Sequence, residues 1–447
     1  MIADTPRCLP CLFVCPVMLS RRNSHFTDPI RRVGLRRASE IGQPPREHSE
    51  YLRAHQMSEI VASVGAAMHE LHAPATAEPR RRELQGMLHR ERERATADAA
   101  LRAVWRGVIG TTNDELLLWF ALSCIGASLT GTSGASIAIE ERAELTANLQ
   151  TLLLGPSAAT LPASSRSKGV TLLAQLARVA WPAEQPALLH EVLNLLRQPG
   201  STRVLGARIL SAVVDEFGAA KGERPSVQAS RQAALVSFLP DAHAALTEAL
   251  QSEAANAAAA AAAAAPSARD AGGAAGAETC LEAARALLTF GRVRDGADGA
   301  RTFTEAELRS APPLLQAAAA FLTPRGASDV RAAVGALTVL SELSELQDAA
   351  CAALLRPLVQ PMVLGVQQLA SQPVEPYGGS LDDLESAMCY ASEQLCGWLL
   401  GPHLQVTIST RSPHELSWAP VLSRALLRSA SPHISALLGR LRRRCSL

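Results

Sequence analysis

Aromatic residues are scarce in this sequence, and lysine is almost missing. Only 4% of the 447 residues are aromatic, whereas Ala and Leu dominate the 48% that are hydrophobic. Strands favour β-branched and aromatic residues, so this composition argues against a β-sandwich or barrel and suits close packing of helices. Lys168 and Lys221 are the two lysines, and every other basic side chain is arginine.

The sequence also lacks an excess of charge and a long apolar run. It has 43 basic and 42 acidic residues, a formal net charge of +1, so no global field attracts the chain to nucleic acid or to an anionic membrane. No apolar stretch reaches the roughly 18 residues of a membrane-spanning helix. We therefore expect neither direct nucleic-acid binding nor membrane insertion.

Nine cysteines are too scattered for a disulfide framework, which indicates a reducing, intracellular compartment. We expect those within helical patterns to be small buried thiols; they are Cys124, Cys280, Cys351, Cys389 and Cys396. Cys8, Cys11 and Cys15 cluster near the amino terminus, but no fourth ligand lies at a suitable spacing, which disfavours a zinc site.

The segment from Gly169 to Glu216 predicts three consecutive amphipathic helices separated by single turns. The first ends at Trp181, because the residue before a proline is disfavoured in the α region. The second ends at Pro199-Gly200, and the third begins with Ser201 as its N-cap. Their apolar stripes consist of Leu172, Leu173, Leu176 and Val179, of Leu188, Leu189, Val192, Leu193 and Leu196, and of Val204, Leu205, Ile209, Leu210, Val213 and Phe217. No such helix can bury its stripe alone, so neighbours must stack on it.

Similar helical stripes occur later in the chain. One consists of Val330, Val334, Leu337 and Leu340, and another of Leu384, Met388, Leu395 and Leu399. Pairing the helices gives units of about 40–50 residues, which is the period of HEAT repeats. We predict an all-α fold, a right-handed α-solenoid of HEAT/ARM-like helix pairs.

Composition divides the chain into four parts. Residues 56–250 and 277–447 carry the predicted repeats. Residues 251–276 are a low-complexity Ala/Gly insertion, whose alanines at 257–265 can prolong the preceding helix. Residues 1–55 are rich in arginine, and three interpretations stay open for them: a disordered leader, an organellar targeting segment, or an extension introduced by gene prediction.

Motifs for catalysis and nucleotide binding are missing. No Walker-type loop, dinucleotide fingerprint or nucleophile elbow occurs, and the segment from Gly131 to Gly134 only approaches the last of these. His69 and His72 are three residues apart instead of the four of a zinc protease, and we expect them to face solvent from a short helix. We predict no catalytic residue, no metal site, no cofactor and no enzymatic activity.

Clustered charges have ordinary structural interpretations. Asp382-Asp383 lies at a predicted helix start, where acidic side chains complement the helix dipole, with Ser380 as a possible cap. Asp215-Glu216 lies at a helix end, and we expect it to be solvated. The compact basic cluster is Arg440, Arg442, Arg443 and Arg444, which suits the last turn of a helix; a nuclear-localisation or phosphate-binding role is the alternative.

Two segments suggest a family. Thr112-Asn-Asp-Glu-Leu-Leu-Leu-Trp119 opens one helix, and Arg166 to Pro182 forms another with a basic start, an apolar body and a terminal Trp-Pro. In this order they resemble the amino-terminal region of exportins, the nuclear transport receptors of the importin-β (karyopherin-β) superfamily, most of all the exportin six branch. The resemblance covers about residues 57–250, and exportins are considerably longer, so a shortened or fragmentary relative is expected.

The resemblance implies a receptor that binds Ran-GTP near its amino-terminal end and holds protein cargo further along, such as profilin-actin. It implies contacts with nucleoporins and a location in both nucleus and cytoplasm. No individual Ran-contacting residue is assigned. The alternative is a helical-repeat scaffold that assembles a protein complex without Ran.

Within the two segments, three positions have specific expectations. We expect Trp119 and Trp181 to be core anchors, not exposed contacts for cargo. Lys168 meets an acidic partner or simply points to solvent. Asn113 and Asp114 serve a helix start, because Thr112 and Glu115 have the spacing of a capping box.

Overall fold

The computed structural model describes residues 46–130, 137–219, 224–262, 271–291, 303–322, 330–345, 349–358, 361–362 and 365. The chain divides into two compact units, residues 1–55 and residues 56–447. Residues 46–55 of helix α1 represent the first unit, and the remaining described residues belong to the second.

Regular structure in these ranges is helical throughout, as the composition predicts. The α-helices are α1 (Arg46–His72), α2 (Glu78–Ala97), α3 (Ala99–Thr111), α4 (Glu115–Leu129), α5 (Ile139–Leu154), α6 (Ala163–Ala180), α7 (Leu188–Arg197), α8 (Ser201–Gly218), α9 (Pro225–Ala262), α10 (Ala271–Thr289), α11 (Glu305–Ala319), α12 (Val330–Glu345) and α13 (Ala349–Leu355). Short 3₁₀ turns lie at Pro156–Ala159, Ala320–Leu322 and Arg356–Leu358.

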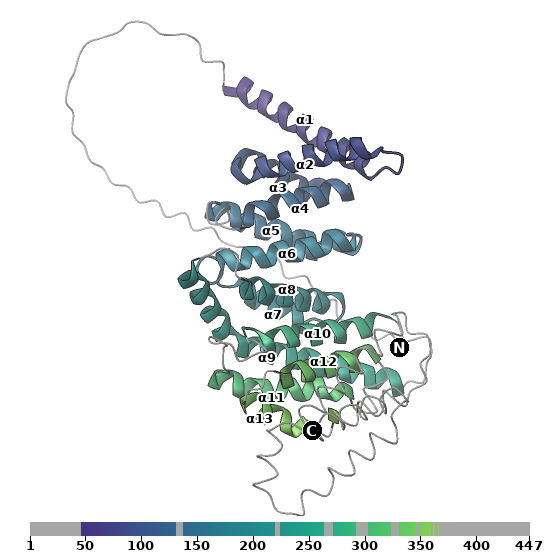
Figure 1. Ribbon diagram of the computed structural model, residues 1–447, viewed down its shortest axis with the longest axis vertical. Coiled ribbons are helices and arrows are strands. Elements are labelled where there is room, and N and C mark those ends of the chain that lie inside the picture. Colours follow the sequence, from purple (N-terminus) through teal and green to yellow (C-terminus); the bar gives the residue numbers. More distant parts are fainter. Residues whose placement is uncertain are drawn as a thin grey trace, which may run out of the picture. The chain divides into compact units, whose positions relative to one another are not determined.

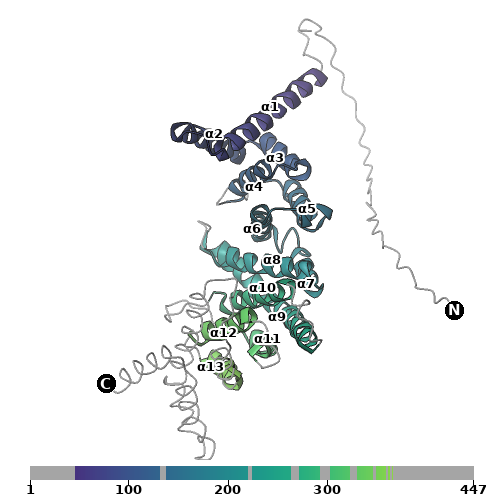
Figure 2. The same ribbon diagram turned by 90° about the vertical axis from the view of Figure 1, so that its right-hand side faces the viewer.

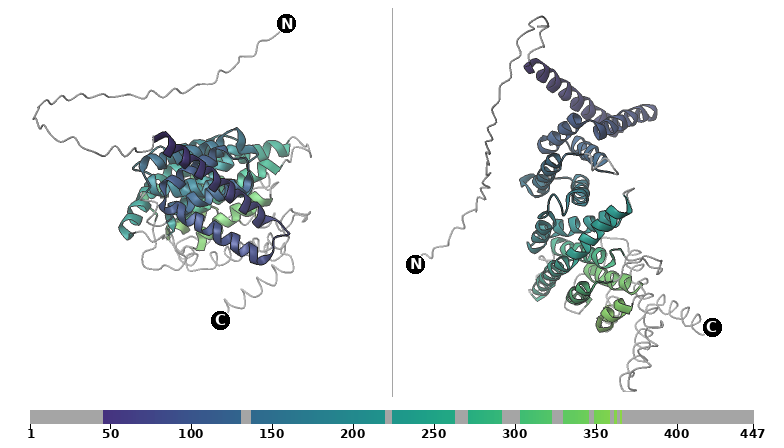
Figure 3. Two further views of the ribbon diagram at one scale, coloured as in Figure 1. Left: turned by 90° about the horizontal axis from the view of Figure 1, so that it is seen from above. Right: turned by 90° about the vertical axis from the view of Figure 1, so that its left-hand side faces the viewer.

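Successive helices of the second unit pack in two layers (Figure 1). The even-numbered helices from α2 to α12 contact one another in order, and on the other side α3 contacts α5 while α7, α9, α11 and α13 form a second series. Figure 2 shows the two series side by side, and Figure 3 shows that successive helices overlie one another from above. Helices also touch across the layers, as α3 and α4, α5 and α6, and α7 and α8 do, so the apolar core continues from one pair to the next.

The three predicted stripes are confirmed. Their leucines and isoleucine are buried between the layers, whereas Val179 and Val204 are half-buried. Trp181 is 7% exposed and packs edge-on against Phe217 at 6.0 Å and Phe238 at 5.7 Å between ring centroids. This tryptophan is therefore a core anchor between α8 and α9, as predicted.

Local sequence explains where these helices begin and end, with one correction. Helix α6 ends before Trp181, whose backbone is extended as the following proline requires. Helix α8 begins at Ser201, but its N-cap is Gly200 and no side chain caps it. Gly200 has φ of 76°, a conformation that glycine adopts without strain. The predicted Ser201 cap was wrong because the turn needs this glycine at the capping position.

The start of α4 also differs from the expected capping box. Its N-cap is Asp114, whose carboxylate accepts hydrogen bonds from the N–H groups of Leu116 at 3.0 Å and Leu117 at 3.2 Å. Thr112 instead accepts from the N–H of Asp114 at 3.1 Å. Asp114 thus serves the helix start as predicted, but Thr112 and Glu115 do not form the box, because the cap lies two residues after Thr112.

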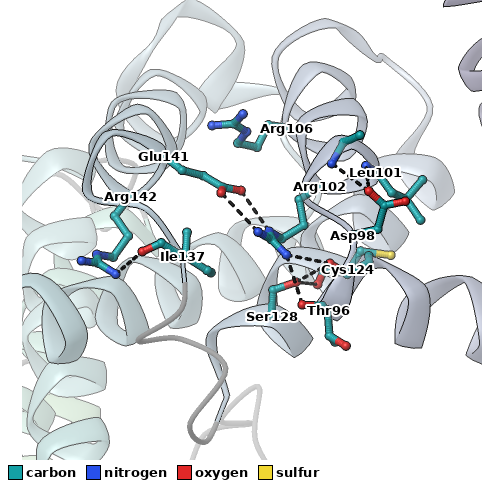
Figure 4. A network of polar contacts seen from close by, with 12 residues as sticks. Thr96, Asp98, Leu101, Arg102, Arg106, Cys124, Ser128, Ile137, Glu141 and Arg142 are labelled. Atoms are coloured by element: carbon teal, nitrogen blue, oxygen red, sulfur yellow. Dashed lines mark hydrogen bonds and ion pairs between the residues drawn. The ribbon is translucent and has the colours of Figure 1, made fainter. Parts of the chain in front are cut away.

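Buried arginines join each helix pair to the next (Figure 4). Arg102 of α3 donates to the carboxylate of Glu141 of α5 at 3.1 and 3.4 Å. It also donates to the carbonyl oxygens of Ala95 and Thr96, at the end of α2. One side chain therefore satisfies carbonyls at the end of α2 that have no partner within the helix, and it fixes the next pair.

Two further buried arginines make related contacts. Arg142 of α5 makes a bidentate pair with Glu184, in the turn before α7, at 2.5 and 2.8 Å. Arg203 of α8 pairs with Glu253 of α9 and also donates to the carbonyl oxygen of Leu196, at the end of α7. Because both partners are largely buried, each pair needs its geometry to compensate for desolvation.

One acidic pair differs from its prediction. Asp215 is exposed, but Glu216 is buried, with a carboxylate oxygen 3.6 Å from Nε of the buried Arg178 in α6. The expectation of a solvated pair was wrong for Glu216, since it lies on the face of α8 that contacts α6. Sequence gives only the position along the helix, not the arginine that a neighbouring helix supplies.

The low-complexity segment is partly helical. Helix α9 continues through the alanines to Ala262, which confirms that they can prolong the preceding helix. Cys124, Cys280 and Cys351 are buried, as expected. Burial raises the pKa of the Cys124 and Cys280 thiols to about 12.

Several predictions concern residues outside the described ranges. They are the cysteine cluster at Cys8, Cys11 and Cys15, the segment Gly131–Gly134, the helix from Leu384 to Leu399 with Cys389 and Cys396, Asp382-Asp383, and the arginines at 440, 442, 443 and 444.

Candidate functional site

A pocket of about 260 Å³ opens among α1, α2 and α4. Its lining residues are Met68, Leu71 and His72 of α1, Gln85, Leu88, His89 and Arg92 of α2, and Trp119, Phe120 and Ser123 of α4. Met68, Leu88 and Phe120 are buried and form its apolar floor. Phe120 is held from behind by Trp105, with ring centroids 5.2 Å apart, so the floor is firmly packed.

Trp119 lies at the edge of this pocket, and its position differs from the one that we predicted. It is 42% exposed, so it is not the core anchor that we expected. It shares a helix face with Glu115 and Ser123, four residues before and after it, and this face borders the pocket. Large exposed aromatic side chains are concentrated at binding surfaces, which makes Trp119 the leading candidate contact residue.

The surroundings of Lys168 match neither of the two roles that we expected for it. This side chain is half-buried on α6, and its Nζ lies 5.8 Å from the centroid of the Trp119 ring. Burial, together with the positive charge of Arg92, lowers the pKa of Lys168. Lys168 therefore neither points freely to solvent nor meets an acidic residue within the described part of the chain, but lies over an exposed aromatic face.

Arg92 provides a second positive charge. It lines the pocket from α2 and shares a hydrogen bond of 3.1 Å with Nδ1 of His89. Among the described residues, no carboxylate lies within ion-pair distance of Arg92 or Lys168. The two cations therefore lie on either side of Trp119, on α2 and α6, and no carboxylate in contact with them neutralises their charges.

Acidic side chains near the pocket have other partners. Asp114 accepts from the ring of His69 at 2.7 Å in addition to capping α4. Glu115 accepts from the hydroxyl of Ser164 at 3.1 Å, and Glu91 forms a pair with Arg94 at 2.7 Å. The positive side of the pocket therefore stays available to a negatively charged ligand.

His69 and His72, near the end of α1, have different surroundings. His69 pairs with Asp114, whereas His72 lines the pocket. Within the described ranges, no three His, Cys, Asp or Glu side chains gather as metal ligands would. Both histidines are exposed, as expected, but the helix that carries them is 27 residues long, so the prediction of a short helix was wrong.

The pocket as a whole was missed by the sequence analysis. Residues 115–129 are so uniformly apolar that every face of α4 looks buried. Only the polar neighbours Glu115 and Ser123, at spacings of four from Trp119, indicate that this tryptophan lies on a different face. Arg92 lies in the arginine-rich helix α2, so the sequence alone does not distinguish it from the other arginines there.

The chain matches no model of a known protein family and no curated protein. Among the residues that the structure describes, no helix is both long and apolar enough to cross a bilayer.

Proposed function

We propose that this protein is a helical-repeat receptor for other proteins, of the exportin type, that binds Ran-GTP and protein cargo and carries cargo out of the nucleus. The supporting observation is the packing of α2–α13 in two layers, in which each helix buries its stripe against its neighbours. Stacked helices of this kind present extended binding surfaces instead of one central cavity. The proposed architecture is a right-handed α-solenoid of HEAT/ARM-like helix pairs.

The resemblance to exportins gives the proposal its specific form. The matching segments become the start of α4 and most of α6, which contact each other. Ran-GTP and cargo would bind with positive coupling in the nucleus, and hydrolysis of GTP in the cytoplasm would release both. The receptor would interact with nucleoporins and shuttle between nucleus and cytoplasm. No catalytic step and no cofactor enter this proposal.

The test is a pull-down of the full chain with immobilised Ran loaded with GTP or with GDP. Selective retention on Ran-GTP, increased by adding profilin-actin or another cargo, would support the receptor. Equal retention on both forms, or on neither, would overturn Ran-dependent transport.

The second candidate is a scaffold that assembles a protein complex without Ran. The Arg–Glu pairs that join successive helix pairs favour it, because Arg102, Arg142 and Arg203 each fix one pair against the next. A platform with fixed spacing suits assembly of a complex, whereas a transport receptor must change curvature to release its cargo. X-ray scattering of the free chain at two salt concentrations tests this: unchanged dimensions favour the scaffold.

A further inference from the structure

We propose that the pocket lined by Trp119 and Arg92, with Lys168 over the Trp119 ring, binds an acidic peptide segment of a partner protein, with an aromatic or branched aliphatic side chain inserted between acidic residues. This inference rests on the proposal that the chain binds proteins, but not on the identity of Ran or of any cargo. It assigns a specific surface and a ligand chemistry.

The volume of the pocket limits the apolar part of the ligand. A cavity of about 150 Å³ lined by aliphatic and aromatic side chains holds one benzene. The pocket here has about 260 Å³ and a floor of Met68, Leu88 and Phe120. It therefore accommodates one phenylalanine- or leucine-sized side chain together with part of the adjoining backbone.

Charge determines the flanking part of the ligand. Lys168 lies over the Trp119 ring, Arg92 lines the pocket, and neither has a carboxylate within ion-pair distance in the described part of the chain. Arg92 of α2 lines the same pocket as Trp119, Lys168 of α6 lies over the Trp119 ring, and Arg92 acts electrostatically on Lys168. An acidic ligand relieves this repulsion, whereas a basic ligand increases it, so the ligand carries Asp or Glu beside its apolar residue.

The polar side chains of the pocket suit a peptide backbone. Gln85 presents a hydrogen-bonding group at the pocket, and the hydroxyl oxygen of Ser123, whose O–H donates to the carbonyl oxygen of Trp119 at 2.8 Å, can still accept a hydrogen bond. His72 and His89 lie at exposed positions on α1 and α2. A peptide offers N–H and C=O groups for these side chains. A nucleic acid would use the cations and Trp119 for stacking, but it has no group that matches the buried apolar floor.

The experiment uses a random 12-residue peptide library displayed on phage, selected on the full chain. Selection on the Trp119→Ala/Lys168→Met double variant in parallel removes peptides that bind elsewhere. We expect peptides lost on the variant to contain Phe, Leu or Trp flanked by Asp or Glu. Recovery of no variant-sensitive peptide, or of variant-sensitive peptides without acidic residues, would overturn the proposal.

A recovered peptide, labelled with a fluorophore, then gives quantitative affinities by anisotropy. We expect Trp119→Ala to weaken binding at least tenfold, and Lys168→Met and Arg92→Met to weaken it several-fold each with a reduced dependence on salt. The matched controls are Leu154→Ala, an exposed apolar residue on α5, and Arg90→Met, an exposed arginine on α2 outside the pocket. Equal losses for the controls would contradict the assignment.

Two further arms separate the alternatives. A single-stranded oligonucleotide with the same number of charges should compete at least tenfold less well than the peptide; tighter competition would assign the site to nucleic acid and overturn the peptide proposal. The Ran pull-down is repeated with Trp119→Ala. Loss of peptide binding with Ran binding unchanged keeps both proposals, whereas peptide binding without any Ran binding removes only the transport function.

Discussion

The surroundings of Trp119 and Trp181 show how one residue type serves two purposes in the same array of helices. Trp181 is almost fully buried and contacts two phenylalanine rings, so it joins α8 and α9. Trp119 is 42% exposed and contacts a cation from the adjacent helix. Both follow apolar segments in the sequence, but only the second is free to meet a partner. The difference lies in which helices pack around each ring.

The largest expected effect comes from removing the buried ring. Trp181→Ala should destabilise the protein by about 3–5 kcal/mol, because truncation leaves a cavity beside Phe217 and Phe238. Trp119→Ala should change stability by only ~0.5 kcal/mol, as is usual for a surface position. Urea unfolding followed by circular dichroism measures both variants. Similar losses for the two would show that Trp119 also holds the fold together.

A buried ion pair and an exposed one should differ in the same way as the two tryptophans. Arg203→Met leaves Glu253 as an uncompensated buried carboxylate and should cost about 3–5 kcal/mol. Arg82→Met removes an exposed arginine that pairs with Glu78 on the same helix, and it should cost at most ~0.5 kcal/mol.

Thermal unfolding of the Arg203 and Arg82 variants, with the double variant Arg203→Met/Glu253→Leu, completes the test. Removing both members of the buried pair should recover much of the lost stability, since no charge is then left without a partner. If the double variant were as unstable as Arg203→Met, the loss would come from the packing of the arginine, not from its charge.

Sequence determines much of this fold but not the exposed aromatic site at Trp119. The periodic leucines and the Trp-Pro ending predict α6, α7 and α8 because those signals are local. Trp119, Glu216 and Arg203 were beyond prediction, since the partner that defines each role comes from another helix, tens of residues away. The position of Gly200 as N-cap depends on a turn conformation that sequence alone does not fix.

Alanine substitutions at two glycines should change stability by smaller amounts and in opposite directions. A Cβ at Gly206 of α8 would lie 2.9 Å from Cβ of Leu195 and from the backbone N of Leu196, so Gly206→Ala should cost about 1–3 kcal/mol by separating α7 from α8. A Cβ at Gly107 of α3 meets no atom within 4 Å, so Gly107→Ala should stabilise the protein by about 0.4–1 kcal/mol. Differential scanning calorimetry of both variants distinguishes them, and a stabilising Gly206→Ala would refute the close contact.

Asp114, the N-cap of the helix that carries Trp119, gives a further effect of modest size. Burial would raise the pKa of Asp114, but hydrogen bonds from His69 and the N–H groups of Leu117 and Leu116 outweigh it and lower the pKa. A carboxyl group with a lowered folded-state pKa stabilises the protein above its unfolded pKa, near 3.8, and this stability is lost as the pH falls through the folded value. Asp114→Ala should cost about 0.5–2 kcal/mol at neutral pH, typical of a lost N-cap.

Asp114→Asn separates the charge of this cap from its hydrogen bonds. Asparagine caps helices as well as aspartate does, so most of the stability at pH 7 should remain, while the part of the acid dependence below pH 4 that comes from residue 114 disappears. Unfolding midpoints of wild type and Asp114→Asn from pH 2.5 to 7 measure it. Parallel curves would mean that Asp114 titrates alike in the folded and unfolded chains. In that case the charge of Asp114 would not help to position Trp119, and the packing of α4 alone would hold Trp119 at the pocket.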